Sequence, residues 1–200
     1  MIKSARDIRG GEMTDIPGSA SDGRHTHRVL LAYATGFGTT RDVAVAIGEV
    51  LGQAGASVEV KPIRDVADLE NYDAVIIGSP IRYDNWMSEA RRFVLAHQDR
   101  LGTLPVAFFF TCLTLSQPTE KARQHASTYT NKLSHLCSRV EPISIGGFAG
   151  VLDYSKMPPW LRLIARCAMA IFGAKEGDYR DWGLIRAWAE DVRAAMAKIG

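Results

Sequence analysis

The feature that most constrains the fold of this chain is a repeated alternation between short apolar segments and longer amphipathic ones. Short runs rich in Val, Ile, Leu and Phe predict strands, and they occupy residues 28–34, 57–63, 73–79, 105–111 and 140–150. The runs "DAVIIGS" and "PVAFFFT" are continuously apolar, as in parallel strands that are covered on both faces. Segments with apolar residues at helical spacing lie at residues 39–55, 85–101 and 119–137. Strands that alternate with helices predict a parallel sheet built from right-handed crossovers.

This pattern defines the expected fold class and domain organisation. We predict an α/β three-layer sandwich around a five-stranded parallel sheet of order 2-1-3-4-5, with extra C-terminal helices near 159–172 and 181–198. A short helical turn is expected at residues 65–69. The chain has 200 residues, 46% of them hydrophobic, which suits one domain, and we place that domain at residues 28–200. Residues 1–27 are polar, lack the apolar stretch of a signal peptide, and are expected to form a disordered tail.

Charge and cysteine content limit the classes of partner and cofactor. The formal net charge of +2 is too small to indicate nucleic-acid binding. Cys112, Cys137 and Cys167 form no CxxC pair, and no His/Cys cluster has the spacing of zinc ligands. An odd number of cysteines without a disulfide framework suits a reducing compartment. We therefore expect no nucleic-acid partner, no metal and a cytoplasmic location.

The loop after the first predicted strand, within "AYATGFGTTRDVA" (32–44), is rich in hydroxyl and glycine residues. These residues are Thr35, Gly36, Gly38, Thr39 and Thr40. Glycines allow close approach to the backbone, and the N-terminus of the following helix carries partial positive charge. The loop matches neither GxxxxGK[ST] nor GxGxxG, which disfavours a nucleoside triphosphatase and a dinucleotide site. It indicates a single terminal phosphate held by amides and hydroxyls; the alternative is a Gly-rich turn with a threonine N-cap.

Two further segments end strands beside the point where the strand order reverses, which is where ligands bind in such sheets. In "SPIRYDNW" (79–86), Tyr83 and Trp86 can sandwich a planar ring, and Arg82 can balance charge on a reduced ring or hold a substrate carboxylate. The alternatives are that Trp86 starts the core face of a helix and that Arg82 is a solvated surface charge. In the segment 111–117, Cys112 is more typical of a packing residue than of a reactive thiol.

Several stretches resemble known flavin proteins. "YATGFGTTRDVA" is similar to the FMN-phosphate loop of flavodoxins. "NYDAVIIGSPIRY", "FVLAHQDRLGTLPVAFFF", "GGFAGVLDY" and the late "DW" (181–182) resemble the flavodoxin-domain, menaquinone-dependent protoporphyrinogen IX dehydrogenases. The resemblance implies a flavodoxin-like fold and FMN as cofactor. It places the isoalloxazine between the 79–83 and 111–115 loops. The FMN-binding positions that it implies are Thr35, Phe37, Gly38, Thr39, Thr40, Ser79, Pro80, Ile81, Arg82, Tyr83, Thr111, Cys112 and Leu113.

The function expected from these features is that of an FMN-dependent oxidoreductase. It would pass electrons between a small organic substrate, such as a protoporphyrinogen-like tetrapyrrole, and a quinone-type acceptor, with Arg82 and Tyr83 in contact with substrate or flavin. The first alternative is a flavodoxin-type electron carrier between redox proteins, and the second is a flavodoxin domain that binds a partner without flavin. The segment between Tyr154 and Asp181 is shorter and less basic than in the resembling family, and we expect substrate or quinone specificity there.

The segment 158–173 is unusually apolar for a surface element. From Trp160 to Phe172 its only charged residues are Arg162 and Arg166, which share one helical face. A run of this length is too short to span a bilayer, which needs roughly 20 residues. Three roles stay open: peripheral contact with the inner face of the membrane and its quinones, a homodimer interface, or packing within the chain.

Overall fold

The computed structural model describes residues 27–117, 119–136, 138–156, 160, 162–163 and 175–199. The predicted tail at 1–27 therefore lies outside the described residues, apart from His27. The predicted helix at 159–172 also lies outside them, apart from Trp160, Arg162 and Leu163.

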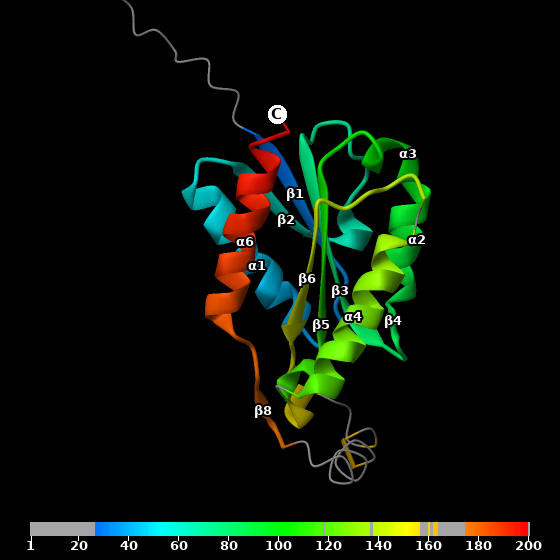
Figure 1. Cartoon of the computed structure of the whole chain (residues 1–200), viewed down its shortest axis with the longest axis vertical. Coiled ribbons are helices and arrows are strands. Elements are labelled where there is room, and N and C mark those ends of the chain that lie inside the picture. The colour runs from blue at the N-terminus through cyan, green and yellow to red at the C-terminus, as the bar shows by residue number, and fades with distance from the viewer. Residues whose placement is uncertain are drawn as a thin grey trace, which may run out of the picture.

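The described residues contain the predicted alternation of strands and helices (Figure 1). The strands are β1 (Arg28–Tyr33), β2 (Ser57–Pro62), β3 (Ala74–Arg82), β4 (Asn85–Trp86), β5 (Val106–Cys112), β6 (Ser144–Ala149), β7 (Val151–Leu152) and β8 (Gly177–Asp178). The helices are α1 (Thr39–Gln53), α2 (Ser88–Ala96), α3 (Gln98–Leu101), α4 (Glu120–Ser134) and α6 (Trp182–Met196). Short 3₁₀ turns are η1 (Ile63–Asp65), η2 (Leu113–Ser116) and η3 (Tyr154–Lys156).

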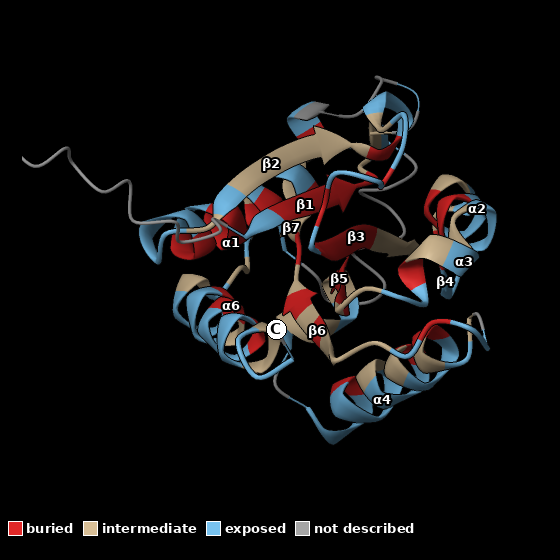
Figure 2. Ribbon diagram, turned by 90° about the horizontal axis from the view of Figure 1, so that it is seen from above, coloured by how far each residue is buried: buried red, intermediate tan, exposed pale blue. Residues whose placement is uncertain are grey.

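The main sheet has the predicted topology. Its parallel strands lie in the order β2-β1-β3-β5-β6, which is the order 2-1-3-4-5 of the predicted strands, and β4 pairs antiparallel with β3. Figure 2 shows α1 and α6 on one face of the sheet and α2, α3 and α4 on the other. A two-stranded sheet of β7 and β8 adds to this arrangement and has no counterpart among the predicted strands.

The core lies on both faces of the sheet because successive side chains of a strand point to opposite sides. Ile76 and Phe109 belong to the cluster beneath α1 and α6. Their neighbours Ile77 and Phe108 belong to the cluster beneath α2 and α4. All four are at most 1% exposed, which explains why these strands read as continuous apolar runs rather than as alternating ones.

The prediction of one helix at 85–101 is wrong for its first residues, and the observed helix is interrupted at His97. Strand β3 continues to Arg82. Tyr83 and Asp84 then form a tight turn, and β4 pairs back against β3 before α2 begins at Ser88. Tyr83 and Asp84 both have positive φ, 48° and 59°, as a two-residue hairpin turn requires. α2 ends at Ala96, and α3 follows His97 as a separate turn.

Two smaller features complete the comparison with the predicted elements. The helical turn expected at 65–69 is wrong, because the 3₁₀ turn occupies Ile63–Asp65 instead. The last helix begins at the "DW" pair as predicted, and the Asp181 side chain accepts a hydrogen bond from the Leu184 amide at 2.9 Å. Within the described part of the chain, no helix has the length and apolar character needed to cross a bilayer.

Candidate functional site

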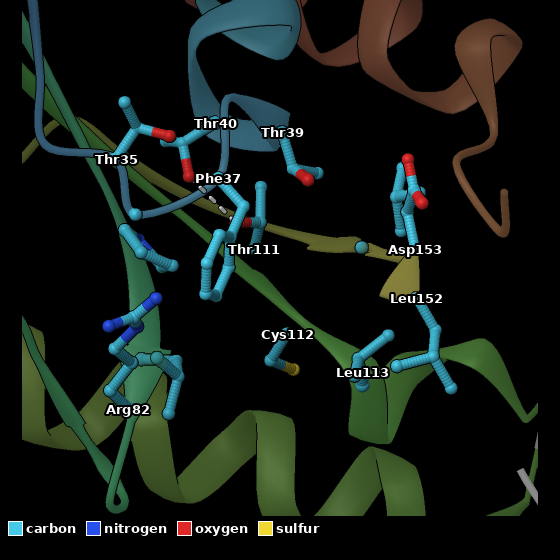
Figure 3. Close-up of a pocket in the computed structure, with 15 residues that line it drawn as sticks. Thr35, Phe37, Thr39, Thr40, Arg82, Thr111, Cys112, Leu113, Leu152 and Asp153 are labelled. Carbon is cyan, nitrogen blue, oxygen red and sulfur yellow. Dashed lines mark hydrogen bonds between the residues drawn. The ribbon is translucent and has the colours of Figure 1, made fainter. Parts of the chain in front are cut away.

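A cavity of about 240 Å³ lies at the carboxyl ends of the strands (Figure 3). Four segments surround it: the β1–α1 loop, the end of β3, the junction of β5 and η2, and the chain from Gly150 to Asp153. The predicted site residues that line it are Thr35, Phe37, Thr39, Thr40, Pro80, Ile81, Arg82, Thr111, Cys112 and Leu113. The topology therefore brings together residues from three separate parts of the sequence at the predicted edge of the sheet.

The β1–α1 loop owes its shape to Gly38. This residue is the N-cap of α1 with φ of 91°, a left-handed conformation that favours glycine. Its amide donates to Thr35 Oγ1 at 3.0 Å, so Gly38 fixes the loop without lining the cavity. Thr39 and Thr40 open the helix, where backbone N–H groups have no intrahelical acceptor. The loop can therefore present amides and hydroxyls to an anion.

Arg82 brings positive charge to the same loop. Its guanidinium carbon lies 5.0 Å from the centroid of the Phe37 ring. A Cβ on Gly36 would lie only 2.0 Å from Arg82 Nη2, so glycine at position 36 leaves the space that the guanidinium occupies. Arg82 lines the cavity, and its side chain is also exposed to solvent.

Besides Gly38, three predicted residues lie off the cavity. Ser79 is buried beneath it, and its hydroxyl accepts a hydrogen bond from the Met87 amide at 3.0 Å. Tyr83 is 98% exposed at the tip of the β3–β4 hairpin and does not line the cavity. Trp86 is 4% exposed and packs edge-on against Phe108, with 5.1 Å between ring centroids. Trp86 is thus a core residue of β4, and the predicted ring sandwich of Tyr83 and Trp86 is not present here.

Helix α4 holds the hairpin that carries Arg82. The Tyr129 hydroxyl donates to Asp84 Oδ1 at 2.8 Å, and Lys132 Nζ donates to the Asp84 carbonyl at 2.8 Å. Burial, followed by the hydrogen bond to the Asp84 carboxylate, raises the pKa of Tyr129 to about 12. These two bonds from α4 fix the tip of the β3–β4 hairpin, which restricts where Arg82 can lie.

The fourth wall of the cavity was missing from the predicted site. Gly150, Val151, Leu152 and Asp153 line it, and all four belong to the stretch "GGFAGVLDY". β7 is held by pairing of Val151 with Asp178 in β8. The glycine-rich strand end was the only signal in the sequence, because the pairing partner lies far along the chain and has no strand-like pattern.

Cys112 lies in the cavity wall with a buried side chain. Burial raises the pKa of its thiol, which keeps the sulfur protonated and a weak nucleophile at neutral pH. This agrees with its interpretation as a packing residue. Among the residues that the structure describes, no three His, Cys, Asp or Glu side chains come together as a metal site.

Comparison with known proteins identifies a family and two similar relatives that share one name. The model of the flavodoxin domain family matches residues 30–178, a range that includes every wall of the cavity. The protoporphyrinogen IX dehydrogenase [quinone] of Escherichia coli (strain K12) is 28% identical over 172 residues, 82% of this chain and 94% of that protein. The protein of the same name from Leishmania major is 28% identical over 180 residues, 84% of this chain and 75% of that protein.

Among solved structures, the flavodiiron core from Synechocystis is similar with a TM-score of 0.52. It is 14% identical, and the match covers 88% of this chain and 38% of that one. At this identity the similarity concerns the fold alone.

Proposed function

The chain belongs to the flavodoxin domain family, and from this premise we propose that it is an FMN-dependent oxidoreductase that passes electrons from a small organic substrate to a quinone-type acceptor. One observation carries the proposal: the first turn of α1, three threonine hydroxyls and the Arg82 guanidinium converge on one cavity. The relatives that cover most of this chain are quinone-dependent dehydrogenases by name.

The donor set of the cavity fits FMN. The amides that open α1 and the hydroxyls of Thr35, Thr39 and Thr40 suit a phosphate monoester, which needs donors and a positive field. Glycine at position 36 leaves room for the Arg82 guanidinium beside the same loop. The Pro80–Arg82 and Thr111–Leu113 segments would flank the flavin ring. When bound, FMN supplies the capacity to accept and release two electrons.

The residues of the chain would position the reactants and set the electrostatics. Arg82 would stabilise negative charge at the edge of the cofactor or bind a substrate carboxylate. Tyr83, at the exposed hairpin tip, would contact a substrate at the mouth of the cavity. Per turnover the substrate loses two electrons and two protons, and a quinone gains them to become a hydroquinone. The substrate that we propose is a protoporphyrinogen-like tetrapyrrole, because the relatives over most of the chain act on it by name.

The test is reconstitution of the full chain with FMN, removal of free flavin by desalting, and anaerobic assay with protoporphyrinogen IX and menadione. We expect retained flavin absorbance and stoichiometric formation of menadiol. Loss of all flavin on desalting would overturn the FMN site and favour the partner-module alternative. Retained flavin without turnover, together with electron transfer between redox proteins, would favour the carrier alternative.

We also propose that the acceptor is a membrane quinone, reached from the cytoplasmic side through residues 158–173. Trp160 and Leu163 are 68% and 67% exposed. Arg162 lies between them in the sequence, and it donates to the carbonyls of Tyr154 at 2.9 Å and Ser155 at 3.1 Å. These bonds tie Arg162 to the turn that directly follows Asp153 of the cavity wall. Trp beside basic residues is typical of interfacial segments.

Vesicle binding tests this second proposal. Sedimentation with anionic phospholipid vesicles is expected to retain the native chain and to release a Trp160→Ser/Leu163→Ser double variant. The matched control is Leu184→Ser, which removes a 54% exposed apolar side chain on α6. No binding by the native chain would contradict membrane contact. A native dimer that the double variant abolishes would assign the segment to the homodimer interface instead.

A further inference from the structure

Arg180 joins three elements, α1, β8 and α6. Its Nη1 donates to Asp42 Oδ2 of α1 at 2.9 Å, and its Nη2 donates to Asp178 Oδ2 of β8 at 2.6 Å. Its guanidinium carbon lies 4.4 Å from the centroid of the Trp182 ring, at the start of α6. The side chain is only 12% exposed. A cation this deeply buried is stable only with its charge partners in place, and here there are two.

Asp42 connects the Arg180 ion pairs to the proposed phosphate site. It lies in the first turn of α1, the turn that Thr39 and Thr40 open. The partial positive charge of a helix N-terminus attracts any nearby anion, so a carboxylate in the first turn competes with a bound phosphate for it and also repels the phosphate directly. Pairing with Arg180, which Asp42 shares with Asp178, offsets part of this negative charge.

The same side chain holds a wall of the cavity in place. Asp178 belongs to β8, which pairs with the Val151 and Leu152 strand that lines the cavity. Figure 3 shows Thr39 on the side of the cavity that faces Asp153, at the end of that wall. By binding Asp42 and Asp178 together, Arg180 links the wall to the helix that starts at the proposed phosphate site.

We propose that Arg180 is a positioning residue for the cofactor phosphate, which acts by neutralising Asp42 and by joining β8 to the first turn of α1. The inference rests on the proposed function, because it requires that the phosphate of FMN binds at the β1–α1 loop. Arg180 lies outside the predicted set of binding residues, and its partner Asp42 lies 138 positions away in the sequence.

The test compares two ligands that differ only in the phosphate. Dissociation constants of FMN and riboflavin for the flavin-free full chain are measured by quenching of flavin fluorescence. Arg180→Met keeps an apolar stem against Trp182 and removes the charge. We expect FMN to bind about tenfold more weakly, the size of an uncancelled charge near a dianion, and riboflavin to bind within twofold of the native value. Arg193→Met is the matched control, because it removes an exposed Arg of α6 that pairs with Glu190.

Rescue separates the electrostatic role from a merely structural one. In the Arg180→Met/Asp42→Asn double variant, the unpaired carboxylate in the first turn of α1 is gone, and FMN affinity is expected to return to within threefold of the native value. Equal losses of FMN and riboflavin affinity, or no rescue, would show that Arg180 only maintains the fold and would overturn the inference.

Two further measurements distinguish failure of the Arg180 inference from failure of the proposed function. If Arg180→Met does not fold, Asp42→Asn alone decides, since it removes the negative charge of Asp42 from the first turn of α1 and should tighten FMN binding severalfold without affecting riboflavin. An unchanged FMN affinity would overturn the inference. If the native chain binds neither flavin, the proposed function itself fails; if it binds both and only the Arg180 comparison fails, the proposed function stands.

Discussion

The hydroxyl oxygens of Thr40 and Thr111 lie 3.0 Å apart although 71 positions separate the two residues in the sequence (Figure 3). Both side chains are buried, with 1% and 3% exposure. The bond joins the first turn of α1 to the end of β5 at the base of the cavity. This pair therefore helps to fix the position of the β1–α1 loop relative to the sheet.

Removal of one of these hydroxyls should cost more than removal of both. Thr40→Val leaves the buried Thr111 hydroxyl without its partner, and we expect the free energy of unfolding to fall by about 1–3 kcal/mol. The Thr40→Val/Thr111→Val variant should recover part of this loss, because no polar group stays unpaired. Urea unfolding of the two variants measures the difference, with Thr40→Ser as the control that retains a hydroxyl. Equal stability of Thr40→Val and the native chain would contradict the prediction.

Substitution of Gly36 should affect binding rather than stability. In Gly36→Ala the new methyl group occupies the position of Arg82 Nη2, and the flexible guanidinium can move away at little cost. We expect a small change in melting temperature and a clear loss of FMN affinity. In an Arg82→Ala background the same substitution should have almost no effect, because the group that it displaces is absent. Additive losses in the double variant would show that Gly36 acts independently of Arg82.

Tyr129 should make stability depend on pH in the alkaline range. Its pKa is raised from about 10 in an unfolded chain to about 12 in the fold, so the unfolded state releases its proton first. The contribution is complete below pH 10 and is lost as pH rises toward 12, by about 2 kcal/mol in all. Urea unfolding between pH 8 and 11 should show a shallower decline for Tyr129→Phe than for the native chain. The exposed Tyr83→Phe serves as control, and parallel curves for native and Tyr129→Phe proteins would refute the prediction.

Trp86 should tolerate replacement by phenylalanine. Among the described residues its Nε1 is buried without a hydrogen-bond partner, so the indole gains nothing from its polar group. Trp86→Phe is expected to change the free energy of unfolding by about 1 kcal/mol or less, whereas Trp86→Ala should cost about 3–5 kcal/mol. FMN affinity of Trp86→Phe should match that of the native chain. A large loss of FMN affinity would restore the alternative in which this ring contacts the flavin.

The fold was predictable because its signals are local. Continuous apolar runs such as residues 73–79 and 105–111 correspond to β3 and β5, and the family match confirms the flavodoxin-like architecture. The error at Trp86 has an equally local cause. The Tyr83–Asp84 turn adopts positive φ without a glycine, so nothing in "SPIRYDNW" indicated that the chain reverses before the helix.

The sequence by itself determined the order of strands and helices and the chemistry of the β1–α1 loop, since periodicity and glycine placement act within a few residues. Tertiary structure alone decided which distant groups meet. Arg180 and Asp42 form an ion pair although 138 positions separate them in the sequence, and β7 pairs with β8 in the fourth wall of the cavity. Such partners are chosen by how whole elements pack against the sheet, because a buried charge or hydroxyl is stable only where another element supplies its counterpart. No local pattern carries that information. The β1–α1 loop could therefore be predicted from the sequence, whereas Arg180 and β8, which pack beside it, could not.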